Sequence, residues 1–152
     1  MENEMLSALE QDARLTPREL SVMFSRAEED VRKEIEACEK DGTILGYRTV
    51  INWDKVGRSA VSALIELKIT PVRDRGFDAV AERVCNYPEV KSVYLMSGGF
   101  DLCLIVEGHT MRDVAYFVAE KLATIDGVAS TATHFVLQRY KDSDIVFDNE
   151  ET

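Results

Sequence analysis

Apolar residues recur every three or four positions through the first part of the chain, which is the spacing of amphipathic helices. Met5, Leu6 and Leu9 indicate a first helix. Thr16-Pro17, followed by Glu19, predicts a capping box at the start of a short second helix. A third helix is predicted between Ser25, as its cap, and Gly42, with an apolar face made of Ala27, Val31, Ile35 and Cys38.

Three helices with a tight turn between the last two predict a helix-turn-helix, which places its final helix in a DNA major groove. We expect Arg26, Arg32 and Lys33 to meet phosphates or guanine edges. Residues 28–30 are acidic and suit the helix dipole, so the sequence leaves open whether this first turn helps or hinders DNA binding. A three-helix packing or dimerisation module is the alternative interpretation.

After residue 60 the pattern changes to alternation, with apolar residues at every odd position from Val61 to Ile69, which predicts a half-buried strand. Helical stripes and further strands then follow at 77–84 (helix), 90–95 and 100–107 (strands), 111–122 (helix) and 128–140 (strand). The order βαββαβ predicts a ferredoxin-like sandwich, so the fold class is α+β. The strand at 100–107 is apolar on both sides, and we therefore expect the sheet face without helices to pack against a second copy of the chain.

Four segments are expected. Residues 1–45 form the helix-turn-helix, 46–58 a linker strand, 59–140 the sandwich, and 141–152 an acidic tail. The tail carries five acids around Ile145-Val146-Phe147. A mobile solubilising tail and a tail that docks on a neighbouring subunit both fit this composition.

The net charge of −10 weakens a nucleic-acid interpretation, because affinity for a phosphate backbone comes largely from Lys and Arg. Residues 1–45 carry −6 of this charge, so the difficulty lies in the helix-turn-helix itself. Cys38, Cys85 and Cys103 are widely spaced on apolar stripes, and we expect three reduced core residues. The acidic start and the lack of a long apolar run predict a cytoplasmic protein without a membrane span.

A Gly98-Gly99 turn precedes Asp101 at the mouth of an apolar strand. A lone carboxylate in this position suggests a small-ligand site. The alternative is an ordinary hairpin turn at Ser97-Gly98-Gly99, in which Asp101 hydrogen-bonds to its own backbone.

Several segments together resemble the Lrp/AsnC (feast/famine) family of bacterial and archaeal regulators, from about residue 4 to residue 140. They are Leu9-Glu10-Gln11-Asp12-Ala13-Arg14, Val31-Arg32-Lys33-Glu34-Ile35, residues 39–47, Gly98-Gly99-Phe100-Asp101, and Gly127-Val128 with Thr131 and Thr133. The resemblance implies a winged-helix-like helix-turn-helix that binds double-stranded DNA, joined by an extended strand at 47–53 to a sandwich that senses an amino acid. It also implies homodimers, formed through the sheets, that assemble into tetramers or octamers.

The same resemblance implies that Gly98, Phe100 and Asp101 line the effector site, with Asp101 pairing to the ammonium group of the effector. Glu34 departs from the family, which usually has a basic residue at this position. An oligomeric sensor whose helix-turn-helix has lost DNA binding is therefore the alternative. An enzyme like the siroheme decarboxylases is less favoured, because His109 and His134 are the only histidines and no nucleophile, metal or cofactor motif accompanies them. We expect no cofactor, no metal and no catalytic site.

Overall fold

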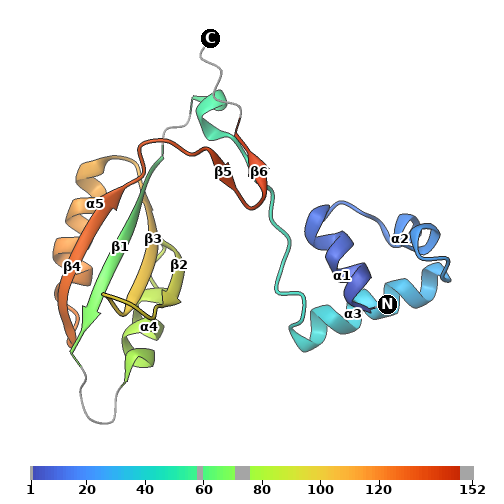
Figure 1. Cartoon of the computed structure of the whole chain (residues 1–152), viewed down its shortest axis with the longest axis horizontal. Helices are drawn as coiled ribbons and strands as arrows, with labels where there is room; N and C mark the ends of the chain where they lie inside the picture. The colour runs from blue at the N-terminus through green and yellow to red at the C-terminus, as the bar shows by residue number, and fades with distance from the viewer. Residues whose placement is uncertain (1, 58–59, 71–75, 148–152) are drawn as a thin grey trace. The chain divides into compact units, whose positions relative to one another are not determined.

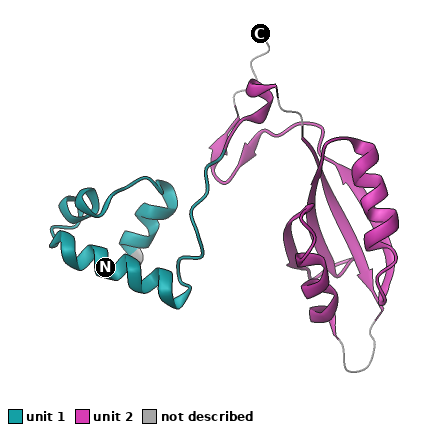
Figure 2. Cartoon of the chain, turned by 180° about the vertical axis from the view of Figure 1, so that it is seen from behind, with its two compact units in different colours: residues 1–50 teal, residues 51–152 magenta. Residues whose placement is uncertain are grey.

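The computed structural model describes residues 2–57, 60–70 and 76–147 (Figure 1). The chain divides into two compact units, Met1–Val50 and Ile51–Thr152 (Figure 2). The predicted boundary between residues 58 and 59, and residues 148–152 of the predicted tail, lie outside the described residues. Within the described residues, no helix combines the length and apolar character needed to cross a membrane.

The first unit consists of the three predicted helices, α1 (Glu2–Gln11), α2 (Pro17–Met23) and α3 (Glu28–Asp41). The buried core of this unit is formed by Met5 and Leu9 of α1, Leu20 of α2 and Val31 of α3. The predicted capping box is confirmed, because the Thr16 hydroxyl accepts from the Glu19 backbone N–H while the Glu19 carboxylate accepts from the Thr16 backbone N–H. Pro17 occupies the first helical position, where a backbone N–H would have no acceptor within the helix, so its missing N–H costs nothing. The start of α2 therefore agrees with the prediction.

The turn between α2 and α3 differs from the prediction at Ser25. Ser25 has a left-handed backbone, with φ of 53°, and cannot cap α3. Ala27 takes the N-cap position and gives no side-chain hydrogen bond. The acids at 28–30 therefore provide the favourable charge at this helix end. Gly42 ends α3 in the left-handed conformation, as predicted, with φ of 82°.

The second unit contains the predicted ferredoxin-like sandwich. Its elements are β1 (Val61–Ile69), α4 (Phe77–Cys85), β2 (Val90–Leu95), β3 (Leu102–Gly108), α5 (Met111–Phe117) with the π-helical turn η2 (Val118–Leu122), and β4 (Val128–Phe135). The strands form an antiparallel sheet in the order β2-β3-β1-β4. Both helices cover one face of this sheet (Figure 1). The core between them is formed by the odd positions of β1, the even positions of β3, and Val80, Val84, Val114 and Leu122.

The other sheet face carries no helix, and two rows of side chains cross it. The strand register places Tyr94, Cys103, Glu66 and Ala132 in one row. The second row contains Ser92, Ile105, Leu64 and His134. We call these eight residues the open sheet face.

The ends of the second unit differ from the predicted pattern. The last strand of the sheet stops at Phe135, five residues before the predicted end. The extended strand predicted at 47–53 does not form, because residues 47–52 pair with none of the described strands. Trp53–Val56 form a 3-10 turn, η1. The first part of the predicted tail folds as a hairpin of β5 (Lys141–Asp142) and β6 (Ile145–Val146). Ser143 and Asp144 make its two-residue turn, with φ of 48° and 62°.

Candidate functional site

The outer face of α3 is the surface that a helix-turn-helix would present to DNA. Val31 and Cys38 face the interior of the unit, so the residues on the opposite side of the helix are exposed. This exposed side includes Glu28, Glu29, Arg32, Lys33, Glu36 and Lys40. The predicted contact residues Arg32 and Lys33 therefore lie where the motif requires them.

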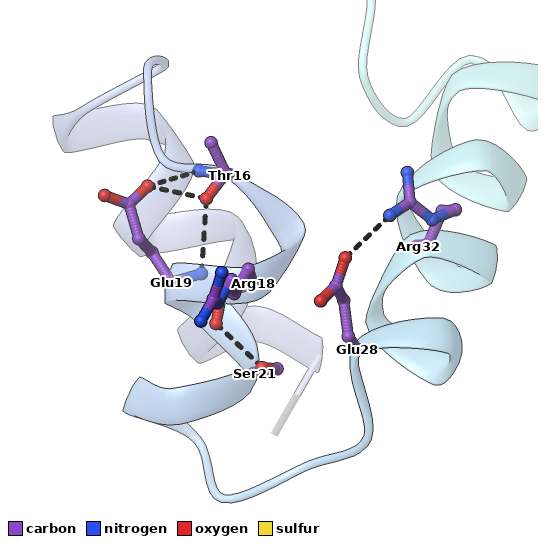
Figure 3. Close-up of polar contacts among 6 residues, drawn as sticks. All are labelled: Thr16, Arg18, Glu19, Ser21, Glu28 and Arg32. Carbon is purple, nitrogen blue, oxygen red and sulfur yellow. Dashed lines mark hydrogen bonds and ion pairs between the residues drawn. The ribbon is translucent and has the colours of Figure 1, made fainter.

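Each of the three predicted DNA-contacting residues is paired with a glutamate of α3. Arg32 Nη2 lies 2.7 Å from Glu28 Oε1 (Figure 3), and Lys33 Nζ lies 3.5 Å from Glu29 Oε1, both one helical turn apart. Such exposed pairs contribute only about 0.3–0.5 kcal/mol each. A phosphate can therefore displace either glutamate at small cost.

The Arg26 ion pair differs from the other two, which lie within α3. Arg26 is in the turn between α2 and α3, and its partner is Glu34 in the middle of α3. The hydrogen bond that the Arg26 guanidinium donates to this carboxylate raises the pKa of Arg26 above its ordinary value. The exposed fractions of the two side chains are 29% and 20%, lower than in the other two pairs. Arg26 thus ties the turn to α3, and any phosphate contact must compete with Glu34.

Arg18 is a basic residue outside the set of DNA contacts predicted from the sequence. It lies at the second position of α2, is exposed, and forms no ion pair with any described residue (Figure 3). In a helix-turn-helix the helix before the turn crosses the DNA backbone. The signal was present in the sequence, since Arg18 follows Thr16-Pro17 directly and must therefore sit in the first turn of that helix.

The predicted effector residues lie together at the β2–β3 turn. Gly98 is exposed, Phe100 and Asp101 are half-buried, and Asp101 immediately precedes β3. A Cβ atom added to Gly98 or Gly99 would meet no heavy atom within 4 Å, and neither glycine has positive φ. The fold of the single chain therefore does not itself require glycine at these two positions.

Asp101 fastens this turn to the end of β1. Its Oδ2 accepts from the Ile69 backbone N–H at 2.7 Å, at the place where the β1–β4 register shifts. Its own backbone N–H donates to Leu67 O at 2.9 Å, and its carbonyl accepts from Met96 N–H at 2.8 Å. One carboxylate oxygen thus has a structural role, but its donor lies on β1 and not in the local turn that the alternative interpretation named. The carboxylate is fixed in position.

The open sheet face also contains polar side chains. His134 Nε2 lies 3.3 Å from Glu66 Oε1, across neighbouring strands. Burial, together with the nearby Glu66 carboxylate, raises the pKa of the Cys103 thiol. Cys38 and Cys103 are buried as predicted, whereas the prediction for Cys85 is wrong, because this residue ends α4 and is exposed.

The part of the chain that the structure describes contains no group of three or more His, Cys, Asp or Glu side chains arranged to hold an ion. Of the two histidines, His134 lies within contact distance of the Glu66 carboxylate, and His109 is an exposed residue directly after β3.

Comparison with known proteins connects both units to one group of regulators. Residues 62–146 match the family described as the Lrp/AsnC ligand binding domain. The chain is 43% identical to YugG of Bacillus subtilis, named as an uncharacterized HTH-type transcriptional regulator, over 97% of this chain and 89% of the relative. It is 30% identical to the HTH-type transcriptional regulator LrpA of Pyrococcus abyssi, over 90% of this chain and 94% of the relative.

A solved structure shares this fold. The crystal structure of the transcriptional regulator NMB0573 of Neisseria meningitidis, determined as an L-methionine complex, superposes with a TM-score of 0.75. The two sequences are 25% identical, and the alignment covers 93% of this chain and 90% of the other.

Proposed function

The chain belongs to the Lrp/AsnC family of ligand-responsive transcriptional regulators, and from this membership we propose how its two units divide the work. Residues 17–41 bind double-stranded DNA, and the sandwich binds an amino acid and joins copies of the chain. We propose that the protein acts in the cytoplasm. The observation that carries this proposal is the complete α2-turn-α3 motif, in which the outer face of α3 exposes Arg32 and Lys33.

DNA binding is proposed to use Arg32 and Lys33 on α3 and Arg18 on α2, with Arg26 contributing when it leaves Glu34. The exposed ion pairs on α3 support this role, because they hold the cations on the outer face and cost little to break. The acidic surroundings make each head a weak binder. An oligomer offsets this weakness, because several linked heads bind one duplex with high effective concentration.

The proposed effector is an amino acid, as in the L-methionine complex of NMB0573. Gly98, Phe100 and Asp101 form its site. The two open glycines let another backbone or a ligand approach closely, and the fixed Asp101 carboxylate supplies a charge for an ammonium group. Asp101 accepts the Ile69 N–H through one oxygen, so the carboxylate retains acceptor capacity.

The open sheet face is proposed as the surface that joins two copies. It presents Leu64, Ile105 and Tyr94 without a covering helix, and a sheet face with such residues is stabilised when another layer covers it. Tetramers or octamers of such dimers are the larger assemblies that we propose.

Loss of DNA binding, with the helix-turn-helix kept as a protein-interaction module, is the second candidate. The acidic residues 28–30 and the net charge of −6 over residues 1–45 favour it. An enzymatic function has less support, because the relatives are named as transcriptional regulators.

The deciding experiment is a genome-wide map of the DNA bound by the full chain in its own cells. We expect discrete sites upstream of genes, and we expect them to disappear in the variant carrying Arg32→Glu and Lys33→Glu. If the wild-type protein forms intact oligomers and yet enriches no sites, the interaction module replaces the regulator as the better account.

A further inference from the structure

We propose that His134 and Glu66 form a pH-sensitive switch on the open sheet face, which strengthens the association of two copies in mildly acidic solution and weakens it in mildly alkaline solution. His134 is on β4, and Glu66 is on the neighbouring strand β1. Histidine suits this role, because its charge changes between about pH 5 and 8. The inference rests on the proposed function of the open sheet face as the surface that joins two copies.

The two side chains of the switch contact each other within one copy. His134 Nε2 lies 3.3 Å from Glu66 Oε1, and the strand register makes the two residues diagonal neighbours on β4 and β1. The exposed fractions of the side chains are 58% for His134 and 33% for Glu66, so water solvates both groups in a single copy. The contact therefore contributes little until another layer covers it.

The other six residues of the open sheet face carry no charge that could replace the imidazole. They are Leu64, Ser92, Tyr94, Cys103, Ile105 and Ala132. Tyrosine hydroxyls are neutral near pH 7. Burial, together with the Glu66 carboxylate, raises the pKa of the Cys103 thiol, so this thiol is neutral there as well. His134 is therefore the residue of this face that can neutralise Glu66.

Charged groups at the margins of the open sheet face lie outside its two rows. At one end are Lys68, which is exposed, and Asp101, whose carboxylate accepts from a backbone N–H of β1. At the other end are Glu107, near the end of β3, and Arg139, which is ion-paired with Asp142. Ordinary lysine, arginine and carboxylate groups do not titrate between pH 6 and 8. A change of association over this range therefore points to the histidine.

Covering the open sheet face with a second copy sets the direction of the switch. Burial removes water from the Glu66 carboxylate, and a protonated His134 beside it offsets this loss, whereas a neutral imidazole does not. A buried charge without its partner is more costly than the buried pair. Association therefore takes up protons, and its gain is complete in mild acid and lost as pH rises. A two-fold interface contains the pair twice, so each dimer takes up as many as two protons.

The test measures the dissociation constant of the dimer at pH 6 and at pH 8 by sedimentation of dilute full-length protein. A fluorescent label is attached to Cys85, the exposed thiol at the end of α4, which lies on the helical side of the sheet (Figure 1). We expect the wild-type dissociation constant to be about tenfold higher at pH 8. His134→Gln is expected to remove this difference. Glu66→Gln is expected to reverse it, because a protonated His134 then has no carboxylate beside it and is costly to bury.

His109→Gln is the matched control, because His109 is the other histidine of the chain and is exposed directly after β3. It is expected to keep the wild-type pH dependence. A dimer with the same dissociation constant at both pH values overturns the switch and leaves the proposed interface intact, whereas monomers at both pH values overturn the two together. A pH dependence that persists in His134→Gln also overturns the switch. If His134→Gln folds poorly, the direction of the change in Glu66→Gln decides.

Discussion

Arg26 and Glu34 form the ion pair that most restricts DNA binding by the helix-turn-helix. Replacing Glu34 by Gln frees the guanidinium and removes a negative charge from the surface that faces phosphates. We expect Glu34→Gln to raise affinity for duplex DNA about fivefold, which corresponds to roughly 1 kcal/mol. Fluorescence anisotropy with a labelled duplex measures this change.

Glu10→Gln is the charge-matched control, because Glu10 is exposed on α1 and lies outside α3. Its affinity is expected to stay close to that of the wild type. If both variants gained the same affinity for DNA, the gain would come from the change in net charge and not from release of Arg26.

The three thiols differ in exposure and should differ in reactivity. Cys85 is exposed, whereas Cys38 and Cys103 are buried, and the raised pKa of Cys103 further lowers its thiolate fraction at neutral pH. We expect a thiol reagent to modify Cys85 first in the native protein, and all three after unfolding. Mass spectrometry of partially labelled protein identifies the sites, and early labelling of Cys103 would contradict the described sheet.

At the scale of elements, an ion pair joins η2 to the residue before β2. Lys121 Nζ lies 2.8 Å from Glu89 Oε1 and 5.5 Å from the centres of the Tyr87 and Phe117 rings. The hydrogen bond from Lys121 lowers the pKa of Glu89 below its ordinary value of 4.5. The pair is partly exposed, so it stabilises the fold by only about 0.5–1 kcal/mol.

The direction of this pKa shift fixes the pH dependence. A carboxylate with a lowered folded-state pKa stabilises the fold above the unfolded pKa near 4.5, and this contribution disappears as pH falls through the lower folded value. We expect Glu89→Gln to be less stable than wild type at pH 7 and to approach it in stability below pH 4.5. Urea unfolding at pH 7 and below pH 4.5 measures the difference in the free energy of unfolding between the two proteins. A difference that does not change with pH would contradict the role assigned to the Glu89–Lys121 pair.

Local patterns predicted the elements well, and contacts between distant residues explain what they missed. The capping box involves only Thr16, Pro17 and Glu19, which are close in the sequence, so their spacing alone predicts it. The hydrogen bond from the Ile69 backbone N–H to the Asp101 carboxylate joins residues 32 positions apart and depends on the sheet register. The Arg26–Glu34 pair depends on the left-handed turn at Ser25, which no sequence spacing indicated.

At the scale of the whole molecule, the open sheet face is expected to hold two copies together. Ile105→Asp places a charge at the centre of this face, beside Leu64 and Ser92. We expect the variant to lose the dimer at concentrations where the wild type keeps it, because a buried unpaired carboxylate is costly. Light scattering coupled to gel filtration gives the mass. Tyr116→Asp, on the exposed side of α5, should keep the wild-type mass, and an unchanged mass for Ile105→Asp would place the interface elsewhere.

The helix-turn-helix is proposed to bind duplex phosphates in spite of its acidic surroundings. The most direct test is the affinity of the full-length protein for one genomically bound duplex, measured by anisotropy over a series of salt concentrations. We expect log affinity to fall linearly with log salt, with a slope of about −0.9 for each neutralised phosphate, and to fall less steeply in the variant carrying Arg32→Gln and Lys33→Gln. No binding at the lowest salt, or binding that salt does not weaken, would contradict the account.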